Sequence, residues 1–437
     1  MKAQSQFRLS ENQAGVGIRD FPSLVRVRQS FPRPVEADVE GAVRRELTPF
    51  LAGIKRGQKI AITGSSRGIA NLPRIMKASV DQLRSAGADP FIVPAMGSHG
   101  GATAAGQVGV LANMGITEAT VGCPIRSSMD VIQVGTTATG FPVFQDKIAS
   151  EADGVLVINR VKPHTGFTER VESGICKMLV IGLGKQEGAS KIHHQALRVE
   201  LGRMVLDASK MILESGQVRF IGALAVVENA FKETAVIQGL SLARHAELVE
   251  GENKLLLRAY DLLPRLPFNQ MDGLIVDKIG KNISGSGMDT NVIGRKPGQT
   301  EPQIGVIYVR GLTEETHGNA TGIGMADLMP RPLLEQIDFN ATYMNSFTAK
   351  RLVGSKMPLM MEDEVTAVQV MMNFRADADP ASARIVWIKN TLALDQLWAS
   401  TAMLDDIRAN SRLEVISPAL PMTVDGEGSL IEPRVAR

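Results

Sequence analysis

The feature that most constrains the fold is a repeated order of short apolar run, polar loop and helical pattern. Four such runs lie in KIAITGSSRG, PFIVPAMGSHGG, GVLVINRVKPH and VRFIGALAVVEN. They predict strands at Lys59–Ile62, Phe91–Val93, Val155–Ile158 and Phe220–Val227. Helical patterns follow at Leu72–Ala86, from about Thr103, and at Gln195–Ser215. Alternation of this kind indicates an α/β fold with a parallel, doubly wound sheet.

A second α/β region follows the proline-containing segment LLPRLPFNQMDG, which we interpret as a linker. Its predicted strands are Gly273–Val276, Gly305–Val309, Arg384–Ile388 and Leu413–Ile416, with helices near Glu362–Met372 and Ser400–Arg408. A chain of 437 residues is long enough for two or three domains. We therefore predict an N-terminal catalytic and cofactor-binding α/β domain over 1–268. A C-terminal α/β domain over 269–437 would close over an active site in the cleft between them, and each domain would hold a mostly parallel sheet.

Composition excludes several classes of partner. Lysine and arginine number 48 against 46 aspartates and glutamates, so the formal net charge is only +2 and a nucleic-acid partner is not expected. No apolar run approaches the roughly 20 residues of a membrane span, and the N-terminus lacks the apolar stretch of a signal peptide. Cys123 and Cys176 are too few for a disulfide framework. We expect a reduced, cytoplasmic protein without a membrane partner.

Three cationic or titratable side chains follow predicted strands. Arg67, His99 and His164 each lie just beyond the C-terminal end of a different strand. In a doubly wound sheet the ligand crevice lies outside these strand ends. The arginine suits a substrate carboxylate, and two imidazoles that face one crevice suit an acid/base pair. Taken alone, Arg67 is equally well explained as a surface arginine near a helix start, and a lone loop histidine such as His164 is more often a solvated or capping residue.

The loop AMGSHGGAT has the composition of an anion-binding turn. Backbone N–H groups of a glycine-rich loop before a helix can cradle a phosphate. The candidate residues are Gly97, Ser98, Gly100, Gly101 and Thr103. The loop matches neither a Walker motif nor a dinucleotide fingerprint, and a tight strand-to-helix turn explains it equally well.

The segment SGICKMLVIGLGKQEGASKIHH contains a candidate nucleophile and a candidate metal ligand. Lys177 is followed by an apolar run, which would desolvate its amine; alternatively it pairs with Glu172. His193 and His194 are predicted at the start of a helix. Adjacent helical residues point in different directions, so only one of them is expected to bind a metal. Any metal would therefore need most of its ligands from elsewhere.

Taken together, these ordered motifs resemble the nickel-dependent lactate racemase family, with its 2-hydroxyacid racemase and epimerase relatives. The likeness spans most of the chain. The family's arginine is matched by Arg67 in TGSSRG, and its two loop histidines by His99 in GSHGGAT and His164 in KPHTGF. The lysine that becomes attached to the cofactor is matched by Lys177 in SGICKML, and the metal-ligand histidine by His193.

The resemblance implies an isomerase that racemises or epimerises a small 2-hydroxy acid. Its cofactor would be the nickel-pincer nucleotide, pyridinium-3,5-bisthiocarboxylic acid mononucleotide nickel, tethered to Lys177 with His193 as the nickel (Ni) ligand. His99 or His164 would take the hydroxyl proton, depending on the enantiomer, while the α-hydrogen leaves as hydride. Arg67 would hold the carboxylate and the Gly97–Thr103 loop the nucleotide phosphate. Cofactor biosynthesis proteins are implied partners, and an oligomer is compatible with the resemblance.

The chain departs from the lactate enzymes in places. Three additional residues lie within TERVES, and Gly64 stands where an acidic residue is expected. In the second domain only MDTNVIGRK loosely matches the family's polar substrate set, which makes Arg295 and Lys296 candidate substrate-binding residues. The substrate therefore stays open among lactate, a dicarboxylate, an aromatic acid and a sugar acid.

Two other functions remain compatible with the residues. Lys177 could form a Schiff base with a carbonyl substrate, with His164 as proton shuttle. A sugar-acid- or nucleotide-binding protein without catalytic activity would need no reactive lysine.

Overall fold

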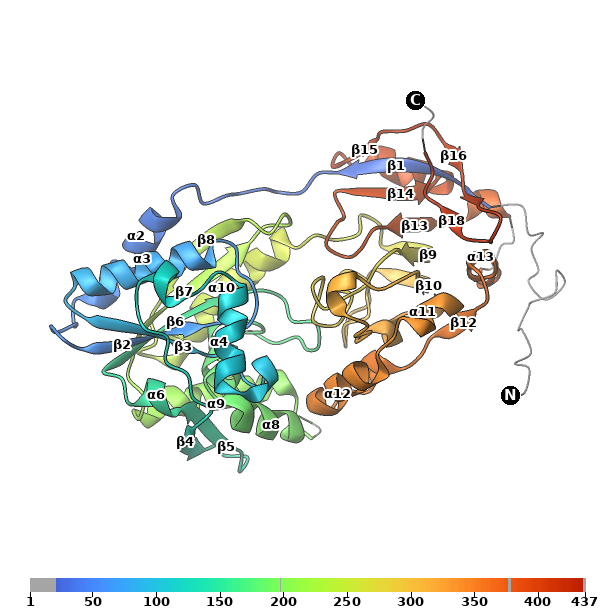
Figure 1. Ribbon diagram of the computed structural model, residues 1–437. Helices are drawn as coiled ribbons and strands as arrows, with labels where there is room; N and C mark the ends of the chain where they lie inside the picture. Colours follow the sequence, from blue (N-terminus) through green and yellow to red (C-terminus); the bar gives the residue numbers. More distant parts are fainter. Residues whose placement is uncertain (1–20, 197, 376–378, 435–437) are drawn as a thin grey trace. The chain divides into compact units, whose positions relative to one another are not determined.

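The computed structural model describes residues 21–196, 198–375 and 379–434. These residues group into two compact units. The central unit is Pro32–Leu263, and the terminal unit combines the chain up to Phe31 with the chain from Pro264 onward. Each unit has its own sheet and its own hydrophobic cores (Figure 1).

The central unit is built on a five-stranded sheet in the order β3-β2-β6-β7-β8. The first four strands are parallel, and the last pairs antiparallel with β7. The strands are β2 (Lys59–Gly64), β3 (Asp89–Pro94), β6 (Gly154–Arg160), β7 (Phe220–Glu228) and β8 (Thr234–Leu240). A separate hairpin consists of β4 (Val131–Thr136) and β5 (Pro142–Asp146).

Helices cover both faces of this sheet because its central strands are apolar on both sides. Leu156 and Ile158 of β6 pack with α2 and α3, whereas Val155 and Val157 pack with α9 and α10. The helices are α2 (Val39–Leu51), α3 (Leu72–Ser85), α4 (Ala104–Asn113), α5 (Glu118–Val121), α6 (Lys147–Ser150), α7 (Ile175–Lys177), α8 (Lys185–Gln195), α9 (Leu201–Ser215) and α10 (His245–Leu262). A 3₁₀ turn, η1 (Gly100–Ala102), precedes α4, and a π-helix, η2 (Met178–Gly182), follows α7.

The terminal unit has a nine-stranded mixed sheet. Strands β12, β11, β10, β9 and β13 are parallel neighbours, and β14, β1 and β15 continue the sheet in antiparallel pairs, with β16 also paired to β1. The strands are β1 (Ser23–Gln29), β9 (Gln270–Val276), β10 (Gln303–Val309), β11 (Leu328–Pro330), β12 (Leu359–Met361), β13 (Ile385–Ile388), β14 (Gln396–Ser400), β15 (Leu413–Val415) and β16 (Leu420–Pro421), with a small hairpin of β17 (Thr423–Val424) and β18 (Leu430–Ile431). The helices are α11 (Arg331–Glu335), α12 (Phe339–Ala349), α13 (Glu364–Asn373) and α14 (Leu404–Ala409), with 3₁₀ turns η3 (Glu314–Thr316), η4 (Ile323–Met325), η5 (Val353–Ser355), η6 (Pro380–Ser382) and η7 (Thr401–Met403).

The predicted α/β class, with a largely parallel sheet in each of two units, is confirmed. The division of the chain differs from the predicted 1–268 and 269–437 in two places. It falls before Pro264, and β1 pairs with β14 of the terminal sheet through Arg26↔Trp398. The predicted helix Gln195–Ser215 begins too early. Gln195 is the last residue of a separate helix, α8, and the helix that ends at Ser215 is α9, which starts at Leu201. The intervening sequence holds no glycine or proline that would mark the break.

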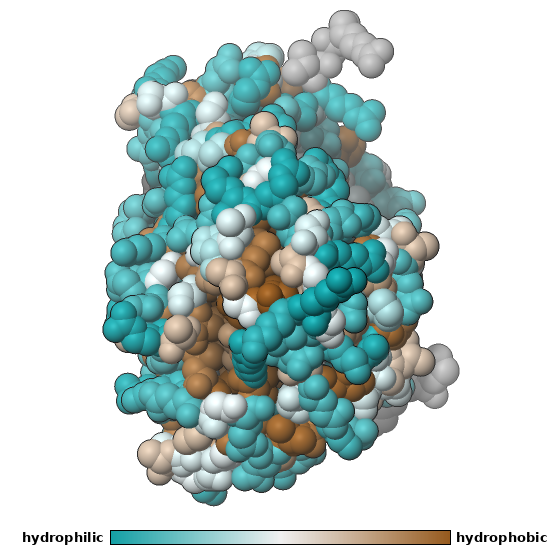
Figure 2. Space-filling model, turned by 90° about the vertical axis from the view of Figure 1, so that its left-hand side faces the viewer, coloured by the Kyte–Doolittle hydropathy of each residue, from teal (hydrophilic) through white to brown (hydrophobic). Residues whose placement is uncertain are grey.

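Most apolar side chains are buried in the cores of the two units. The face drawn in Figure 2 is largely hydrophilic, with hydrophobic residues grouped toward its middle. In the part of the chain that the structure describes, no helix has both the length and the apolar character needed to cross a bilayer.

Candidate active site

The candidate site begins at the carboxyl ends of three neighbouring strands of the central sheet. His99 follows β3, Arg67 follows β2, and His164 follows β6, in the spatial order β3-β2-β6. Parallel strands present their carboxyl ends on the same edge, so the three loops emerge side by side (Figure 1). Arg67 is the middle member of the row.

Arg67 carries its charge among other cations. Although solvent reaches the side chain, surrounding protein atoms desolvate the guanidinium and lower its pKa, and the charge of Arg160 acts in the same direction. Its loop is fixed by Glu228, which accepts the Ala70 N–H at 2.7 Å and also pairs with Arg160. The arrangement favours an anionic ligand at this strand end.

The glycine loop after β3 has an unusual backbone. Gly97, Gly100 and Gly101 have φ values of +58°, +66° and +63°. A Cβ at Gly100 would lie 2.5 Å from the carbonyl carbon of Gly106, so this position requires glycine. Thr103 caps α4, because its hydroxyl oxygen accepts the Gly106 N–H at 3.0 Å. The predicted phosphate-binding role of Gly97, Ser98, Gly100, Gly101 and Thr103 stays a prediction.

His99 is exposed, as are Gly101 and Thr103 of the same loop. Its ring nitrogen Nδ1 lies 2.7 Å from the carbonyl oxygen of Met96. Its carbonyl oxygen lies 3.4 Å from the side-chain amide of Gln107, which also donates to Gly97 O at 2.8 Å. The loop is therefore held from α4 as well as from the strand.

His164 is held at three points. Its backbone N–H donates to Glu172 Oε2 at 2.5 Å, its Nδ1 accepts the Gly166 N–H at 2.9 Å, and its ring stacks on Phe167 with centroids 4.2 Å apart. Glu172 in turn accepts the Tyr260 hydroxyl of α10 at 2.9 Å. The imidazole is thus set by a chain of contacts that begins in a neighbouring helix.

Lys177 ends α7 and directly precedes the π-helix η2. Such π segments are rare and frequently occur at functional sites. Burial lowers the pKa of its ammonium to about 7, with the charges of Arg67 and Lys162 adding to the effect and Glu172 opposing it. About half of the amine is therefore neutral near pH 7. Neighbouring Cys176 is buried and burial raises its thiol pKa, which makes it a structural residue.

His193 and His194 lie in the last turn of α8, not at the start of a helix as predicted. The error follows from the missed helix α8, whose sequence KQEGASKIHHQ shows only a weak apolar stripe. Burial and the charge of Lys177 lower the pKa of His193, so the structure brings these two predicted residues close together. His194 is exposed.

A buried polar network that the sequence did not reveal lies beneath the glycine loop. Lys185 is fully buried, and its Nζ lies 2.9 Å from Asp146 Oδ2, which is also buried. The same ammonium donates to Pro94 O at 2.6 Å and to Gln107 Oε1 at 3.0 Å. One side chain therefore joins the end of β3, the start of α4, the end of β5 and the start of α8.

A second support comes from α10. Glu252 is fully buried and accepts the Cys176 N–H at 2.8 Å, directly beside Lys177. Burial raises its carboxyl pKa to about 7. The Tyr260 hydroxyl, also in α10, donates to Glu172. Helix α10 therefore supports both the segment that holds Lys177 and the loop that holds His164. Only spatial contacts reveal these residues, because nothing in the local pattern of α10 distinguishes them from ordinary helical residues.

The second-domain candidates lie in the terminal unit. Arg295 donates to Asp327 Oδ2 at 3.2 Å, and Lys296 is buried. Both follow β9 in the loop that also holds Asp289 and Asn291. Their substrate-binding role stays a prediction.

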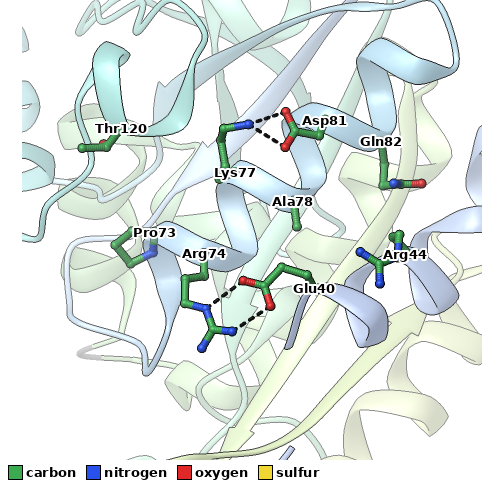
Figure 3. A pocket seen from close by; sticks show the side chains of 9 residues that line it. All are labelled: Glu40, Arg44, Pro73, Arg74, Lys77, Ala78, Asp81, Gln82 and Thr120. Carbon is green, nitrogen blue, oxygen red and sulfur yellow. Dashed lines mark hydrogen bonds and ion pairs between the residues drawn. The ribbon is translucent and has the colours of Figure 1, made fainter. Parts of the chain in front are cut away.

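Neither a cluster of metal-ligating side chains nor a surface depression points to a further candidate site in the described residues. Among residues 21–196, 198–375 and 379–434, no group of three or more His, Cys, Asp or Glu side chains is placed to hold a metal. A surface depression of about 290 Å³ on the central unit lies between ion-paired side chains of α2 and α3 (Figure 3). Its lining is Glu40, Arg44, Pro73, Arg74, Lys77, Ala78, Asp81, Gln82 and Thr120. None of these is a candidate site residue.

Comparison with known proteins gives a structural likeness. No protein-family model and no curated protein sequence matches the chain. Its structure is similar to that of the lactate racemase apoprotein from Thermoanaerobacterium thermosaccharolyticum, with a TM-score of 0.50 and 14% sequence identity. The match covers 84% of this chain and 94% of that chain. The chain has a lactate racemase-like fold; at this identity the likeness concerns the fold alone.

Proposed function

We propose that the chain is a racemase or epimerase of a 2-hydroxy acid that works with a nickel-pincer nucleotide attached to Lys177. The observation that carries the proposal is the environment of this lysine. Its amine lies among cations, has a pKa lowered to about 7, and is close enough to His193 to lower the pKa of that imidazole. The lactate racemase-like fold supports the same reading.

The residues around Lys177 fit a nickel-pincer nucleotide in three respects. A lysine forms a covalent bond through its neutral amine, and burial favours that form at Lys177. A metal binds the neutral imidazole, which the lowered pKa of His193 favours. Arg67 and Lys162 add positive charge that suits an anionic cofactor and an anionic substrate. When bound, the nucleotide supplies a pyridinium ring that takes the α-hydrogen as hydride and returns it.

The remaining residues bind the substrate and handle its proton. Arg67 lies between the two histidine loops, where a guanidinium can hold a carboxylate through two parallel hydrogen bonds. A carboxylate fixed there would present its adjacent hydroxyl to an imidazole on either side. His99 and His164 are the groups that hold or move the hydroxyl proton. Arg295 and Lys296 are proposed to bind the rest of the substrate, which leaves the acid itself open.

Cofactor loading tests the proposal most directly. The full chain would be produced together with nickel-pincer cofactor biosynthesis proteins, its expected partners, and analysed by intact mass, peptide mapping and nickel content. We expect a sulfur-containing, nucleotide-sized adduct on the Lys177 peptide. Lys177→Ala should lose it, whereas Lys191→Ala, at an exposed position on α8, should keep it. His193→Ala should lose nickel. An unmodified chain from a host that loads a control racemase would contradict the proposal.

A Schiff-base enzyme is the second candidate, because the same neutral amine would attack a carbonyl. Borohydride treatment with a panel of 2-keto acids distinguishes the two. Reductive trapping of substrate carbon on Lys177, without any nucleotide adduct, would favour the Schiff base.

A further inference from the structure

The carboxyl edge of the central sheet carries a row of cations that extends beyond Arg67. Arg160 ends β6, the strand next to β2, and Lys232 lies in the turn between β7 and β8. Burial lowers the pKa of both Arg67 and Lys232, and the positive charge of Arg160 adds to the decrease in each case. Arg160 therefore lies within electrostatic reach of both residues, in agreement with the strand order β2-β6-β7. We call these three residues the cation row.

A carboxylate at the end of β7, Glu228, accompanies the cation row but does not neutralise it. Its Oε1 accepts the Ala70 N–H at 2.7 Å, and its Oε2 forms the ion pair with Nη1 of Arg160. Among the described residues, Arg67 and Lys232 have no carboxylate within ion-pair distance, and Nε and Nη2 of Arg160 have no acceptor. Three positive charges and one negative charge leave a net charge of +2 along the row.

The turn that holds Lys232 places this lysine in an unfavourable backbone conformation. Lys232 has a φ of +59°, in the left-handed region where glycine or asparagine is preferred. Buried Asn229 fixes the turn, because its Oδ1 accepts the N–H groups of Phe231 and Glu233 at 2.9 and 3.1 Å. The carboxylate of Glu233 is bound by Arg33 at 2.7 and 2.8 Å, so it is not a partner for the lysine. A lysine in a strained position, between carboxylates that are already paired, is better explained by a ligand than by the turn itself.

We infer that Arg160 and Lys232 form a subsite for a second carboxylate, and that the substrate is a 2-hydroxy dicarboxylic acid. This inference rests on the proposed function and deepens it by naming the substrate class. Arg67 would hold the first carboxylate, and the second would accept hydrogen bonds from Nε and Nη2 of Arg160 and from the Lys232 ammonium. Two bound carboxylates balance the net charge of the cation row. The subsite lies within the central unit and is separate from the proposed contributions of Arg295 and Lys296.

The spacing of the strands indicates the length of the acid. Strands β2 and β6 are neighbours, and neighbouring strands lie about 4.8 Å apart. With carbon–carbon bonds of about 1.5 Å, the carboxyl carbons of a four- or five-carbon dicarboxylic acid lie roughly 4–5 Å apart. Such an acid matches one strand interval, from Arg67 to the subsite, whereas a three-carbon diacid is too short.

Binding to the unloaded full chain tests the subsite without cofactor or activity. Isothermal titration calorimetry would compare 2-hydroxybutanedioate with 2-hydroxybutanoate, which has a methyl group in place of the second carboxylate. We expect the dicarboxylate to bind roughly ten-fold more tightly or better, because hydrogen bonds between charged groups are the strong ones. The advantage should shrink as salt is raised, and 2-hydroxypropanedioate should lose most of it. Equal affinities, or no measurable binding of either four-carbon acid, would overturn the inference.

Lys232→Asn separates a ligand-binding role from a structural one, because asparagine tolerates the left-handed conformation but carries no charge. The variant should fold at least as stably as the parent chain and lose roughly five- to ten-fold of the preference for the dicarboxylate. Lys232→Arg should keep the preference. Lys254→Asn, at an exposed position of α10, is the matched control and should bind as the parent chain does. A folded Lys232→Asn chain with an unchanged preference would also overturn the inference.

Failure of the subsite and failure of the proposed function give different results. The binding preference does not depend on the nickel-pincer nucleotide. A chain that prefers the dicarboxylate through Lys232 but takes no adduct on Lys177 would contradict the proposed function and support the subsite. A loaded, active enzyme with a higher kcat/KM for 2-hydroxybutanoate than for 2-hydroxybutanedioate would contradict the subsite alone.

Discussion

Replacing Lys185 with methionine tests how the candidate site is supported. The substitution keeps an unbranched side chain, one atom shorter, but removes an ammonium that lies 2.9 Å from Asp146 Oδ2 in a fully buried position. It also leaves the acceptors Pro94 O and Gln107 Oε1 without this donor. Gln107 holds the glycine loop at Gly97 O, so the effect should reach the His99 loop.

The magnitude follows from the burial of the pair. Removing one partner of a buried ion pair leaves an uncompensated charge and costs about 3–5 kcal/mol. A single domain is stable by about 5–15 kcal/mol, so Lys185→Met should fold with a large part of its stability lost. For a unit of this size, each kcal/mol lowers Tm by about 2–4 °C, which gives a decrease of roughly 6–20 °C.

Urea unfolding followed by circular dichroism measures this loss, and a double-mutant cycle with Asp146→Asn isolates the pair. Because the double variant has neither of the two buried charges, we expect it to be more stable than Lys185→Met alone. The amide that Asp146→Asn introduces keeps an oxygen acceptor and adds an N–H donor, so the site stays polar without carrying a charge. A loss below about 1 kcal/mol for Lys185→Met, or no gain in the double variant, would refute the claim that this pair supports the site.

Three further predictions concern single groups. Because burial lowers the Lys177 pKa to about 7, its labelling by an amine-reactive reagent should reach a plateau just above that pH, with exposed Lys191 as the reference in the same peptide map. Burial raises the Glu252 pKa from 4.5 to about 7, so the stability that its neutral form provides is fully present below about pH 4.5 and is lost as pH rises through 7. Glu252→Gln should remove this pH dependence of stability, measured by urea unfolding at acidic and alkaline pH. An unchanged dependence of stability on pH in the variant would refute the role of the Glu252 carboxyl. Thr103→Ala should destabilise the chain by about 1 kcal/mol through loss of the α4 cap, whereas Thr103→Ser should not.

The residues at the strand ends could be predicted because their placement is encoded locally. An apolar run followed by a polar loop places Arg67, His99 and His164 beyond a strand, and parallel strands share an edge. The family resemblance, carried by motifs within one segment, likewise connected Lys177 with His193, and the charge of Lys177 acts on that imidazole in the structure. None of these inferences needed a contact between distant parts of the chain.

The supporting residues could not be predicted, because their partners are distant in sequence. Glu252 contacts Cys176 across 76 residues, and Tyr260 contacts Glu172 across 88. Strand β1 was missed for the same reason, since its partner β14 lies at the other end of the chain. In each case the local pattern does not differ from that of an ordinary helix or an ordinary strand.

Lys177 and Lys185 show why contacts were needed to separate a structural lysine from a candidate nucleophile. Both lie in SGICKMLVIGLGKQEG, and the sequence alone gives either one an apolar neighbourhood. Lys185 meets a buried carboxylate and two further acceptors, which stabilise its charged form. For Lys177, burial and then the charges of Arg67 and Lys162 lower the pKa from 10.5 to about 7, which corresponds to roughly 5 kcal/mol against the charged form. A lysine that served only packing would gain stability from a partner such as Asp146. The lowered pKa of Lys177 instead suits the covalent bond that we propose for its amine.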